Sequence, residues 1–374
     1  MSGPVPAPPS RSVRYSRQEI FLPIGRGGQE KISAARVAIV GCGALGSQLS
    51  ETMVRAGVGF VRLIDRDIVE ETNLQRQTLF TEADAAALRP KALAARDRLG
   101  AVNSGVTIEA RVEDLNTENA RDLLSGIDLI LDGTDNFDTR YIVNDVAIEN
   151  DVPWIYGACV GSYGLVLPVL RGARRTPCLR CVLGEAPPPG SSPTCDTAGV
   201  IAPTVQVVAG LQRPEALKIL SGHPEAVRVT LTSLDVWSGQ FDRIDLSEVE
   251  PSCDACARGV FLTREQTPGE AFLCGRDAVQ IRPPAKGLRL DLEDFAVTWR
   301  ALGDVTLADH VVRLREPHSE MLLFRDGRAL IKGTADFGRA RAIYARLIGS
   351  YQGRGQASPK EALVSEFAIE ALDT

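Results

Sequence analysis

Two Cys-x-x-Cys pairs are the most specific indication of chemistry in this sequence. The first pair is Cys178 and Cys181, the second is Cys253 and Cys256, and both stand among proline and polar turn residues. Four thiolates in two such pairs are typical of a closed tetrahedral zinc site. A redox-active Cys-x-x-Cys is the alternative, but no thioredoxin-like sequence surrounds either pair. We therefore expect a structural Zn²⁺ that joins two distant segments of one domain.

A glycine-rich turn between an apolar run and a helix indicates a nucleotide site. Gly41, Gly43 and Gly46 form the pattern Gly-x-Gly-x-x-Gly directly after the apolar run 37–40. Such glycines permit a tight turn and a close approach of the backbone to phosphate, and the next helix directs its first N–H groups at an anion. Asp65 ends the following apolar run, at the spacing of an acid that binds ribose hydroxyls. The alternative is a glycine turn needed only for packing.

A polar loop after that second strand carries side chains suited to phosphate. Within residues 66–77, Arg76 could clamp phosphate oxygens and Asn73 could bond ribose or phosphate. Lys91 follows Pro90 and could reach phosphate as a point charge, although an isolated lysine on a helix is more often solvated. Open parallel sheets bind ligands at this end of their strands. A dehydrogenase has little use for such a loop, whereas a site for a triphosphate and a metal would use it.

The sequence Asp132-Gly-Thr-Asp135-Asn136 ends another apolar run and suits Mg²⁺. Mg²⁺ takes few protein carboxylates and completes its shell with substrate phosphates and water. Asp135 or Asn136 could equally serve as the N-cap of a helix predicted at 137–150. Both interpretations stay open at the level of the sequence.

Cys195 lies in a segment rich in proline, glycine and serine, 185–199, between the two Cys-x-x-Cys pairs. It has no partner at metal-ligand spacing, which makes it a candidate nucleophile. The start of a helix predicted at 204–221 could lower its pKa. The alternative is an inert thiol on a loop.

Strands and helices alternate in a way that predicts an α/β fold with a doubly wound, Rossmann-like, mostly parallel sheet. Two short helices are expected within 14–36, where Arg17 belongs to a basic face. Pro90 should start or break one later helix, and Pro214 should kink another. The expected strands are 37–40, 60–64, 106–110, 127–131, 152–156 and 163–170, and the expected later helices are 85–99, 116–124, 137–150 and 204–221.

Length and composition set the wider class. A chain of 374 residues favours two domains, and no apolar run approaches the ~20 residues that span a bilayer, so we expect no membrane segment. The formal net charge of −6 gives no electrostatic footprint for nucleic acid. The Pro-rich start lacks the apolar core of a signal peptide, so the eight cysteines are expected as thiols or metal ligands in the cytoplasm.

We expect four segments along the chain. They are a disordered tail (1–13), the nucleotide-binding domain (14–260), a small α+β domain (261–350) that docks a partner, and a linker with a short helix (351–374). The α+β domain should contain a strand within 274–281, a helix at 292–302, a hairpin of 309–315 and 321–332 that turns at Asp326-Gly327, and a final helix at 335–347.

Taken in order, these motifs resemble the MoeB/ThiF/HesA proteins, the bacterial relatives of ubiquitin-activating enzymes. The resemblance covers about residues 14–260 and is most specific in the Asn-Leu-Gln-Arg-Gln run and the two Cys-x-x-Cys pairs. The shared stretches are RYSRQ (14–18), GCGALG (41–46), DRDIVEETNLQRQTLF (65–80), RPK (89–91), DGTDN (132–136) and TCDTAGVIAP (194–203).

The resemblance implies an enzyme that binds ATP and Mg²⁺ and adenylates the C-terminal Gly-Gly carboxylate of a small ubiquitin-like carrier protein. Pyrophosphate leaves in this step. In the next step the acyl adenylate is attacked by sulfur, for which a donor protein is a possible partner. Positioning and charge neutralisation suffice for such a step, because the carboxylate is already an ionised nucleophile and needs no general base.

The resemblance also implies a role for single residues. Arg17 matches an arginine that reaches the phosphates across a homodimer interface, and Cys195 matches a position that is covalently linked to the carrier in some members and dispensable in others. Ala44 stands where many members have glycine. The implied nucleotide contacts are Gly41, Gly43, Ala44, Asp65 (ribose), Asp67, Asn73, Gln75, Arg76, Lys91, Asp135 (Mg²⁺) and Asn136, and the implied zinc ligands are Cys178, Cys181, Cys253 and Cys256.

Three alternatives remain at this point. One is activation of a ubiquitin-like modifier for protein conjugation, with a thioester at Cys195. Another is an NAD-dependent oxidoreductase, which the phosphate-seeking loop and the zinc pairs disfavour. The last is a non-catalytic scaffold, disfavoured because every position of the ATP site is filled.

Overall fold

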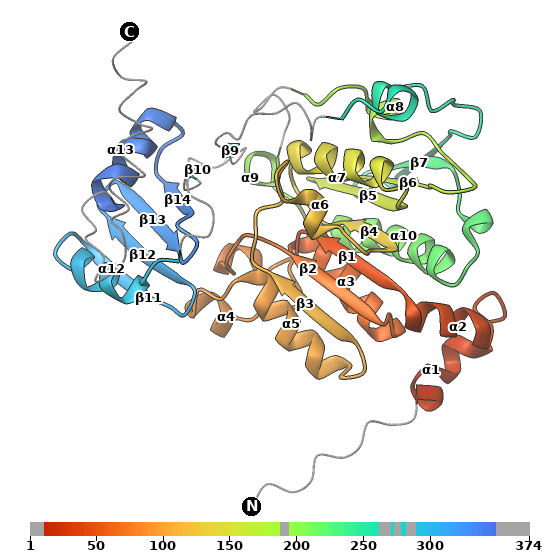
Figure 1. Cartoon of the computed structure of the whole chain (residues 1–374), viewed down its shortest axis with the longest axis horizontal. Helices are drawn as coiled ribbons and strands as arrows, with labels where there is room; N and C mark the ends of the chain where they lie inside the picture. Colours follow the sequence, from red (N-terminus) through yellow and green to blue (C-terminus); the bar gives the residue numbers. More distant parts are fainter. Residues whose placement is uncertain (1–10, 188–193, 262–270, 273–277, 282–288, 349–374) are drawn as a thin grey trace, which may run out of the picture. The chain divides into compact units, whose positions relative to one another are not determined.

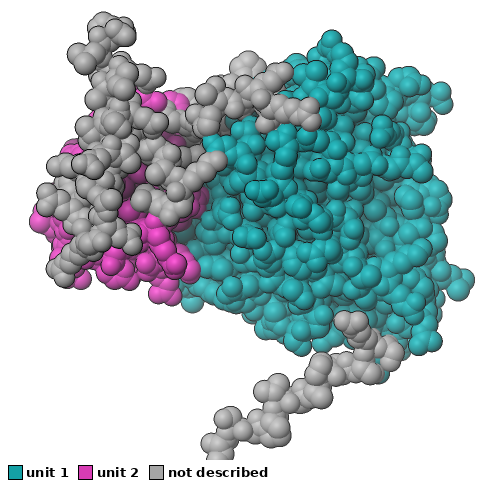
Figure 2. All heavy atoms as spheres, in the orientation of Figure 1, with its two compact units in different colours: residues 1–268 teal, residues 269–374 magenta. Residues whose placement is uncertain are grey.

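The computed structural model describes residues 11–187, 194–261, 271–272, 278–281 and 289–348 (Figure 1). The chain forms two compact units, residues 1–268 and 269–374 (Figure 2). Helix α1 (Arg11–Ile20) begins inside the predicted disordered tail (1–13). The last residues of that predicted tail, from Arg11 on, are therefore helical. The rest of that tail and the predicted linker from 351 lie outside the described residues.

The first unit is built on an eight-stranded sheet in the order β3-β2-β1-β4-β5-β6-β7-β8. Strands β1 to β5 pair in parallel, and β6 to β8 continue the sheet in antiparallel pairs. The strand order reverses between β1 and β4, which confirms the doubly wound prediction. The strands are β1 (Arg36–Val40), β2 (Phe60–Ile64), β3 (Thr107–Arg111), β4 (Leu129–Asp132), β5 (Trp154–Val160), β6 (Tyr163–Val169), β7 (Thr230–Asp235) and β8 (Gln240–Asp245).

Helices cover both faces of the parallel part of this sheet. Strands β1, β2 and β4 alternate their side chains between two apolar clusters, one on each face, so both faces must be shielded from water. One face is covered by α2 (Gly25–Ala34), α3 (Ala44–Ala56), α5 (Lys91–Val102) and α10 (Ala202–Leu220), and the other by α6 (Ala120–Leu123) and α7 (Phe137–Glu149).

Several predicted helices differ in extent from the observed ones. Pro90 divides the predicted helix 85–99, because α4 (Glu82–Ala86) ends before it and α5 begins directly after it. The predicted helix 116–124 is the short α6, since the Asn116 backbone N–H instead donates to the side chain of Asn119. Pro214 lies inside α10. The remaining short helices of this unit are η1 (Glu71–Asn73), α8 (Leu179–Leu183), α9 (Cys195–Ala198), η2 (Pro224–Ala226) and η3 (Asp254–Arg258).

The glycine turn between β1 and α3 packs backbone against backbone. Gly41 has a φ of +85°, and a Cβ there would lie 2.6 Å from the carbonyl oxygen of Gly133, in the turn after β4. A Cβ at Gly46 would overlap the carbonyl group of Gly41. The glycines are therefore required by packing as well as by any ligand.

The second unit is a six-stranded antiparallel sheet in the order β11-β12-β13-β14-β10-β9. Its core lies between one sheet face and the helices α12 (Leu292–Trp299) and α13 (Phe337–Ile348), which confirms an α+β architecture. The strands are β9 (Ala271–Phe272), β10 (Ala278–Ile281), β11 (Asp304–Leu307), β12 (Val311–Glu316), β13 (Ser319–Phe324) and β14 (Ala329–Lys332).

The predicted pairing of 309–315 with the strand that follows is confirmed by β12 and β13, but the turn of this hairpin was placed wrongly. Asp326-Gly327 does form a turn, but it joins β13 to β14, and a second hairpin joins β12 to β13 at residues 317–318. The single predicted strand 321–332 is thus two strands. Of the predicted strand 274–281, residues 278–281 form β10, and 274–277 lie outside the described residues. In the described ranges, no helix has the length and apolar character needed for a bilayer crossing.

The packing of the glycine turn gives a test of stability. We expect Gly46→Ala to lower the free energy of unfolding by about 3 kcal/mol, because the new Cβ meets the Gly41 carbonyl and the turn must move. Gly100→Ala, in α5 with no atom within 4 Å of the new Cβ, should instead raise it by roughly 0.5–1 kcal/mol. Urea unfolding of the two variants measures both values. Equal stability of the two variants would contradict the packing argument.

Candidate active site

Asp65 ties the glycine turn to the end of β2. Its Oδ2 accepts a hydrogen bond from the backbone N–H of Cys42 at 2.6 Å, and its Oδ1 accepts one from the N–H of Asp67 at 2.7 Å. Burial raises the pKa of Asp65, while the positive charge of Lys91 opposes that rise. Each carboxylate oxygen can still accept a further bond. Asp65, which the sequence predicts as the ribose-binding acid, is thus hydrogen-bonded to the glycine turn.

Lys91 is held beside that acid. Its side chain is buried, and Nζ lies 3.1 Å from Oδ2 of Asp67. The backbone N–H of Lys91 donates to the carbonyl oxygen of Asp67 at 2.8 Å, so α5 starts directly against the polar loop. A buried ammonium group beside the carboxylates of Asp65 and Asp67 is a strong local attraction for phosphate oxygens.

The remaining members of the predicted phosphate loop differ in their environment. Asn73 is buried, and its Oδ1 accepts a hydrogen bond from the backbone N–H of Glu70 at 3.1 Å, which closes the turn η1. Arg76 is half-buried and donates to the carbonyl oxygen of Thr72 at 2.9 Å. Gln75 is exposed and reaches the carbonyl oxygen of Val200 at 3.4 Å. Asn73 therefore shapes this loop, whereas Arg76 and Gln75 line its surface.

The turn after β4 is organised by a buried ion pair. Asp132 accepts hydrogen bonds at Oδ1 from the N–H and hydroxyl groups of Thr134, at 2.9 and 2.7 Å. Arg140 lies with Nε 3.3 Å from Oδ2 of Asp132 and donates to the carbonyl oxygen of Thr134 at 2.7 Å. Burial raises the pKa of Asp132, and the charge of Arg140 opposes that rise. These bonds to buried side chains fix the conformation of the turn and, with it, the position of Asp135.

Asn136 and Asp135 divide the roles that the sequence left open. Asn136 is the N-cap of α7, since its Oδ1 accepts from the backbone N–H of Thr139 at 2.9 Å. Asp135 is exposed, and its charge helps to raise the pKa of both Arg66 and Arg140. We therefore take Asp135 as the candidate magnesium carboxylate, with Asn136 beside it in a structural role.

Arg66 connects the two halves of the site and was missed from the sequence. It bonds Asp114 at 2.7 Å and lies 3.7 Å from Asp67. Burial alone would lower the pKa of Arg66, but the carboxylates of Asp114, Asp67 and Asp135 outweigh this and raise it. Arg66 directly follows Asp65 in the chain, and its position beside that acid was the available signal. The structure thus places Asp65, Asp67, Lys91 and Asp135 in one electrostatic neighbourhood.

Arg17 is not part of this neighbourhood in its own chain. It is exposed on α1, where Gln18 donates to the carbonyl oxygen of Ala56 at 3.1 Å. Ala56 ends α3, whereas the glycine turn precedes the first residue of that helix. A helix of this length spans about 20 Å. Arg17 therefore lies at the opposite edge of the sheet from the candidate site.

Cys195 stands beside the end of β5. Its Sγ lies 3.3 Å from the carbonyl oxygen of Cys159, and Thr194 caps the short helix α9 that Cys195 begins. The segment after α9 bridges to Gly161 at Val200, whose carbonyl oxygen accepts from Gln75. The candidate nucleophile is thus connected through one strand-like bridge to the phosphate loop.

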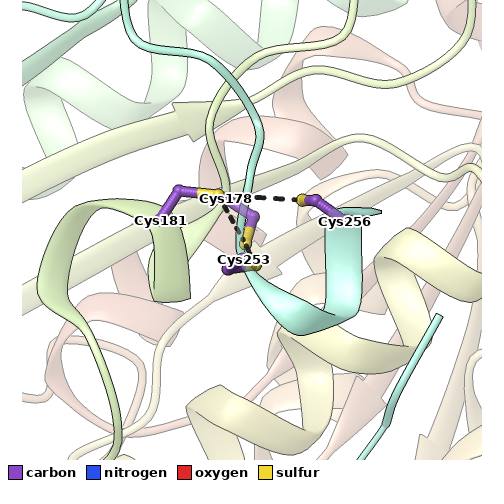
Figure 3. Close-up of side chains that lie close together, drawn as sticks. All are labelled: Cys178, Cys181, Cys253 and Cys256. Atoms are coloured by element: carbon purple, nitrogen blue, oxygen red, sulfur yellow. Dashed lines mark hydrogen bonds between the residues drawn. The ribbon is translucent and has the colours of Figure 1, made fainter. Parts of the chain in front are cut away.

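The four predicted zinc ligands converge in space (Figure 3). Their sulfur atoms all lie within 4.8 Å of one another. The Sγ atom of Cys178 lies 3.7 Å from that of Cys181 and 3.4 Å from that of Cys253. The Sγ atoms of Cys181 and Cys256 are 3.9 Å apart. A tetrahedron of sulfurs around Zn²⁺ with bonds of about 2.3 Å has edges of about 3.8 Å. The geometry therefore fits zinc and confirms the predicted cluster.

Side chains of helix α7 bond the segment that carries the first two cysteines of this cluster. The side chain of Asn144 accepts the backbone N–H of Leu179 at 2.9 Å, and the hydroxyl of Tyr141 donates to the carbonyl oxygen of Gly184 at 2.8 Å. Arg180, between the first two cysteines, lies 3.5 Å from the fully buried Asp145. The first Cys-x-x-Cys turn is thus bonded to α7 at both of its ends.

Comparison with known proteins agrees with this geometry. Residues 15–255 match the ThiF family. The chain belongs to the ThiF family. An NAD-dependent oxidoreductase is thereby ruled out as the reading of the glycine turn. The ThiF-family match ends close to the last zinc ligand, Cys256, and the second unit lies beyond it.

Curated relatives cover most of this ThiF-family chain. It is 45% identical over 340 residues to the sulfur carrier protein ThiS adenylyltransferase of Bacillus subtilis, covering 90% of this chain and 99% of that protein. It is 40% identical over 266 residues to the sulfur carrier protein adenylyltransferase of Thermus thermophilus, covering 70% and 96%. It is 33% identical over 350 residues to the mouse adenylyltransferase and sulfurtransferase MOCS3, covering 93% and 74%.

A solved structure supports the fold of this ThiF-family chain. Escherichia coli MccB, crystallised with ATP, superposes with a TM-score of 0.56 at 22% identity, covering 66% of this chain and 75% of that one. At this identity the likeness concerns the fold alone.

The cysteine cluster predicts a metal-dependent stability. We expect Cys256→Ser to abolish tight zinc binding and to lower Tm by roughly 10 °C, because the metal joins two distant segments only when all four thiolates bind it. Cys159→Ser, outside the cluster, is the matched control and should keep its zinc. Metal analysis and thermal unfolding of the purified proteins measure both effects. A Cys256→Ser protein with full zinc content and unchanged Tm would refute the role of the cluster.

Proposed function

We propose that this chain is an adenylyltransferase that uses ATP to activate the C-terminal Gly-Gly carboxylate of a small ubiquitin-like sulfur-carrier protein. The observation that carries the proposal is the alignment with the Bacillus subtilis ThiS adenylyltransferase, which spans 99% of that protein. The charged neighbourhood at the strand ends supplies the groups that such a step needs. A cytoplasmic location follows, because a reducing compartment keeps the thiols of the cysteine cluster available to metal.

The nucleotide would lie over the turn formed by Gly41, Gly43 and Ala44. Close backbone packing leaves no room for a side chain at Gly41, and the first N–H groups of α3 would bind a phosphate. Asp65, next to the turn, would accept the ribose hydroxyls. The proposed phosphate contacts are Asn73, Gln75, Arg76 and Lys91, with Asp67 as the counter-charge of Lys91.

The reaction requires positioning and charge neutralisation. An oxygen of the carrier carboxylate attacks the α-phosphorus of ATP, the bond to the bridging oxygen of the β-phosphate breaks, and pyrophosphate leaves. Lys91 and Arg76 would neutralise the negative charge that builds up on the phosphates. Asp135 would bind Mg²⁺, which supplies further charge neutralisation on pyrophosphate when it is bound. No proton must be removed from the carboxylate.

A second copy of the chain would complete the site. Arg17 lies at the opposite edge of the sheet from the glycine turn of its own chain, so Arg17 could reach the phosphates only of a partner chain. We therefore propose a homodimer in which each Arg17 serves the site of the other chain.

Cys195 gives two candidate reactions for the step after adenylation. Its position beside the end of β5 suits attack on the acyl adenylate, either by sulfur carried on Cys195 from a donor protein or by its own thiol. The latter would form a thioester for conjugation of a modifier. The chain is also 33% identical to the SAMP-activating enzyme E1 of Haloferax volcanii, covering 66% of this chain and 89% of that one.

The second unit is proposed to dock the carrier or a later partner. The Thermus thermophilus adenylyltransferase aligns with 96% of its own length to only 266 residues of this chain. The alignment with the Bacillus subtilis protein runs over 340 residues and so extends into the second unit. Adenylation therefore has a counterpart without this unit, which favours a role in recognition over one in chemistry.

ATP–pyrophosphate exchange tests the adenylation. Exchange should require a carrier that ends in Gly-Gly, and Asp135→Ala should reduce it by about 100-fold or more through loss of a phosphate-side carboxylate. Cys195→Ala should retain exchange, because the thiol acts only after the adenylate has formed. Absence of exchange with every Gly-Gly carrier, in protein that holds zinc, would reject adenylation of those carriers.

Mixing two inactive variants tests the shared site. Arg17→Ala and Asp135→Ala should each reduce exchange by about 100-fold. After unfolding and joint refolding in equal amounts, about half of the dimers are mixed and each mixed dimer holds one intact site, so about a quarter of the wild-type rate should return. Arg17→Ala refolded with itself is the control. If Arg17 served its own chain, the mixture would stay inactive.

A further inference from the structure

Two thiols that lie far apart in the sequence meet beside the end of β5. Cys159 is on β5, Cys195 begins α9, and Sγ of Cys195 lies 3.3 Å from the carbonyl oxygen of Cys159. Both residues are half-buried. The motifs that define the nucleotide and zinc sites do not use Cys159, and nothing in its spacing on the chain points to Cys195.

The backbone holds the two residues side by side. Gly161 donates its N–H to the carbonyl oxygen of Gly199 at 2.8 Å, and Ile201 donates to the carbonyl oxygen of Gly161 at 3.2 Å. The turn that follows β5 is therefore bonded to the segment that follows α9. A disulfide requires Cα atoms within about 7 Å and side chains that face one another. The sulfur of Cys195 already contacts the backbone of Cys159, which brings the two cysteines close together.

We propose that Cys159 is the resolving thiol of Cys195, which attacks Sγ of Cys195 whenever that sulfur carries a disulfide-linked group and closes a Cys159–Cys195 disulfide. The site takes a thiol or persulfide adduct, held by a sulfur–sulfur bond.

The chemistry balances without a further reactant once the adduct has formed. A disulfide R–S–S–R first reacts with the Cys195 thiol, which gives Cys195–S–S–R and one R–SH. The Cys159 thiol then attacks Sγ of Cys195, the bond from that sulfur to the R group breaks, and a second R–SH leaves with the proton of Cys159. The external disulfide is reduced to two thiols, and the two cysteines are oxidised to one disulfide.

The surroundings of Cys159 keep it in the thiol form. Burial raises the pKa of Cys159 to about 12, the charge of Cys195 adds to this rise, and Arg140 opposes it. Cys159 is thus kept as a thiol, and Cys195 is the residue that we expect to meet an external disulfide first. When Cys195 has become part of a neutral adduct, its contribution to this rise disappears, while burial still raises the pKa of Cys159 and the charge of Arg140 still lowers it.

The pairing would give Cys195 a way to release what it carries. Resting on the proposed function, the consequence is that a sulfur-linked carrier leaves with its thiol while the enzyme retains a reducible disulfide. A reductant then restores both thiols.

The test uses the full-length zinc-loaded protein and dithio-bis-nitrobenzoate, an aryl disulfide that releases a coloured thiol. In the wild type we expect a peptide that contains both Cys159 and Cys195, lighter by two hydrogen atoms, in a digest under non-reducing conditions. No aryl adduct should persist on Cys195. In Cys159→Ser the cross-link should vanish and the aryl adduct should stay on Cys195, with one coloured thiol fewer released per chain.

Two further measurements keep the outcome independent of folding and of ATP. Cys195→Ser should form no cross-link, and Cys159→Ala replaces Cys159→Ser if the serine variant loses its zinc. In the wild type alone, dithiothreitol should reverse the cross-link completely. A stable adduct on Cys195 in the wild type, at the level found in Cys159→Ser, or a cross-link from Cys195 to any other cysteine, would overturn the proposal. Because no nucleotide or carrier is present, neither result depends on adenylation.

Discussion

The contact of three glycines where the strand order reverses is the constraint on which the rest of the first unit depends. Gly41 leaves β1 with its N–H bonded to the carbonyl oxygen of Ile64, and Gly133 leaves β4 with its N–H bonded to that of Val40. The two turns touch through their backbones, and the start of α3 at Gly46 closes over them. No side chain separates the turns, so the acids that follow β2 and β4 are brought to one edge at a fixed spacing.

That edge concentrates charge that must be balanced before any ligand arrives. Asp65 and Asp132 are buried, and each is satisfied by backbone N–H groups as well as by a cation, Lys91 or Arg140. Burial raises the pKa of both acids, yet the paired cations and hydrogen bonds favour the carboxylate form. The site is therefore ordered by its own charges, and a phosphate would enter an arrangement that already exists rather than create it.

Local sequence signals predicted the parts of the site that lie within one strand–turn–helix unit. The glycine turn, the acid at 65 and the cap at Asn136 each depend on neighbours in the chain, and each was visible there. Arg66 and Cys159 were missed because Asp114 and Cys195 come from other segments, and Arg140 was missed although Asp132 and Thr134 lie in its own strand–turn–helix unit. The turn of the hairpin in the second unit was misplaced, since Asp326-Gly327 marks a turn but does not say which strands it joins, and the β12–β13 turn lies at Pro317-His318.

Helix α7 connects the metal cluster to the site. Its first residues follow Asp135 and its cap Asn136, its first turn carries Arg140, and its middle carries Asn144, which bonds the first Cys-x-x-Cys turn. A Zn²⁺ bound by Cys178 and Cys256 would close the long segment between them into a loop whose base is fixed on α7, and Cys195 lies within that loop. The metal would therefore act on the chemistry at a distance, because the helix that it anchors also sets the turn that presents Asp135, and the loop that it closes presents the thiol.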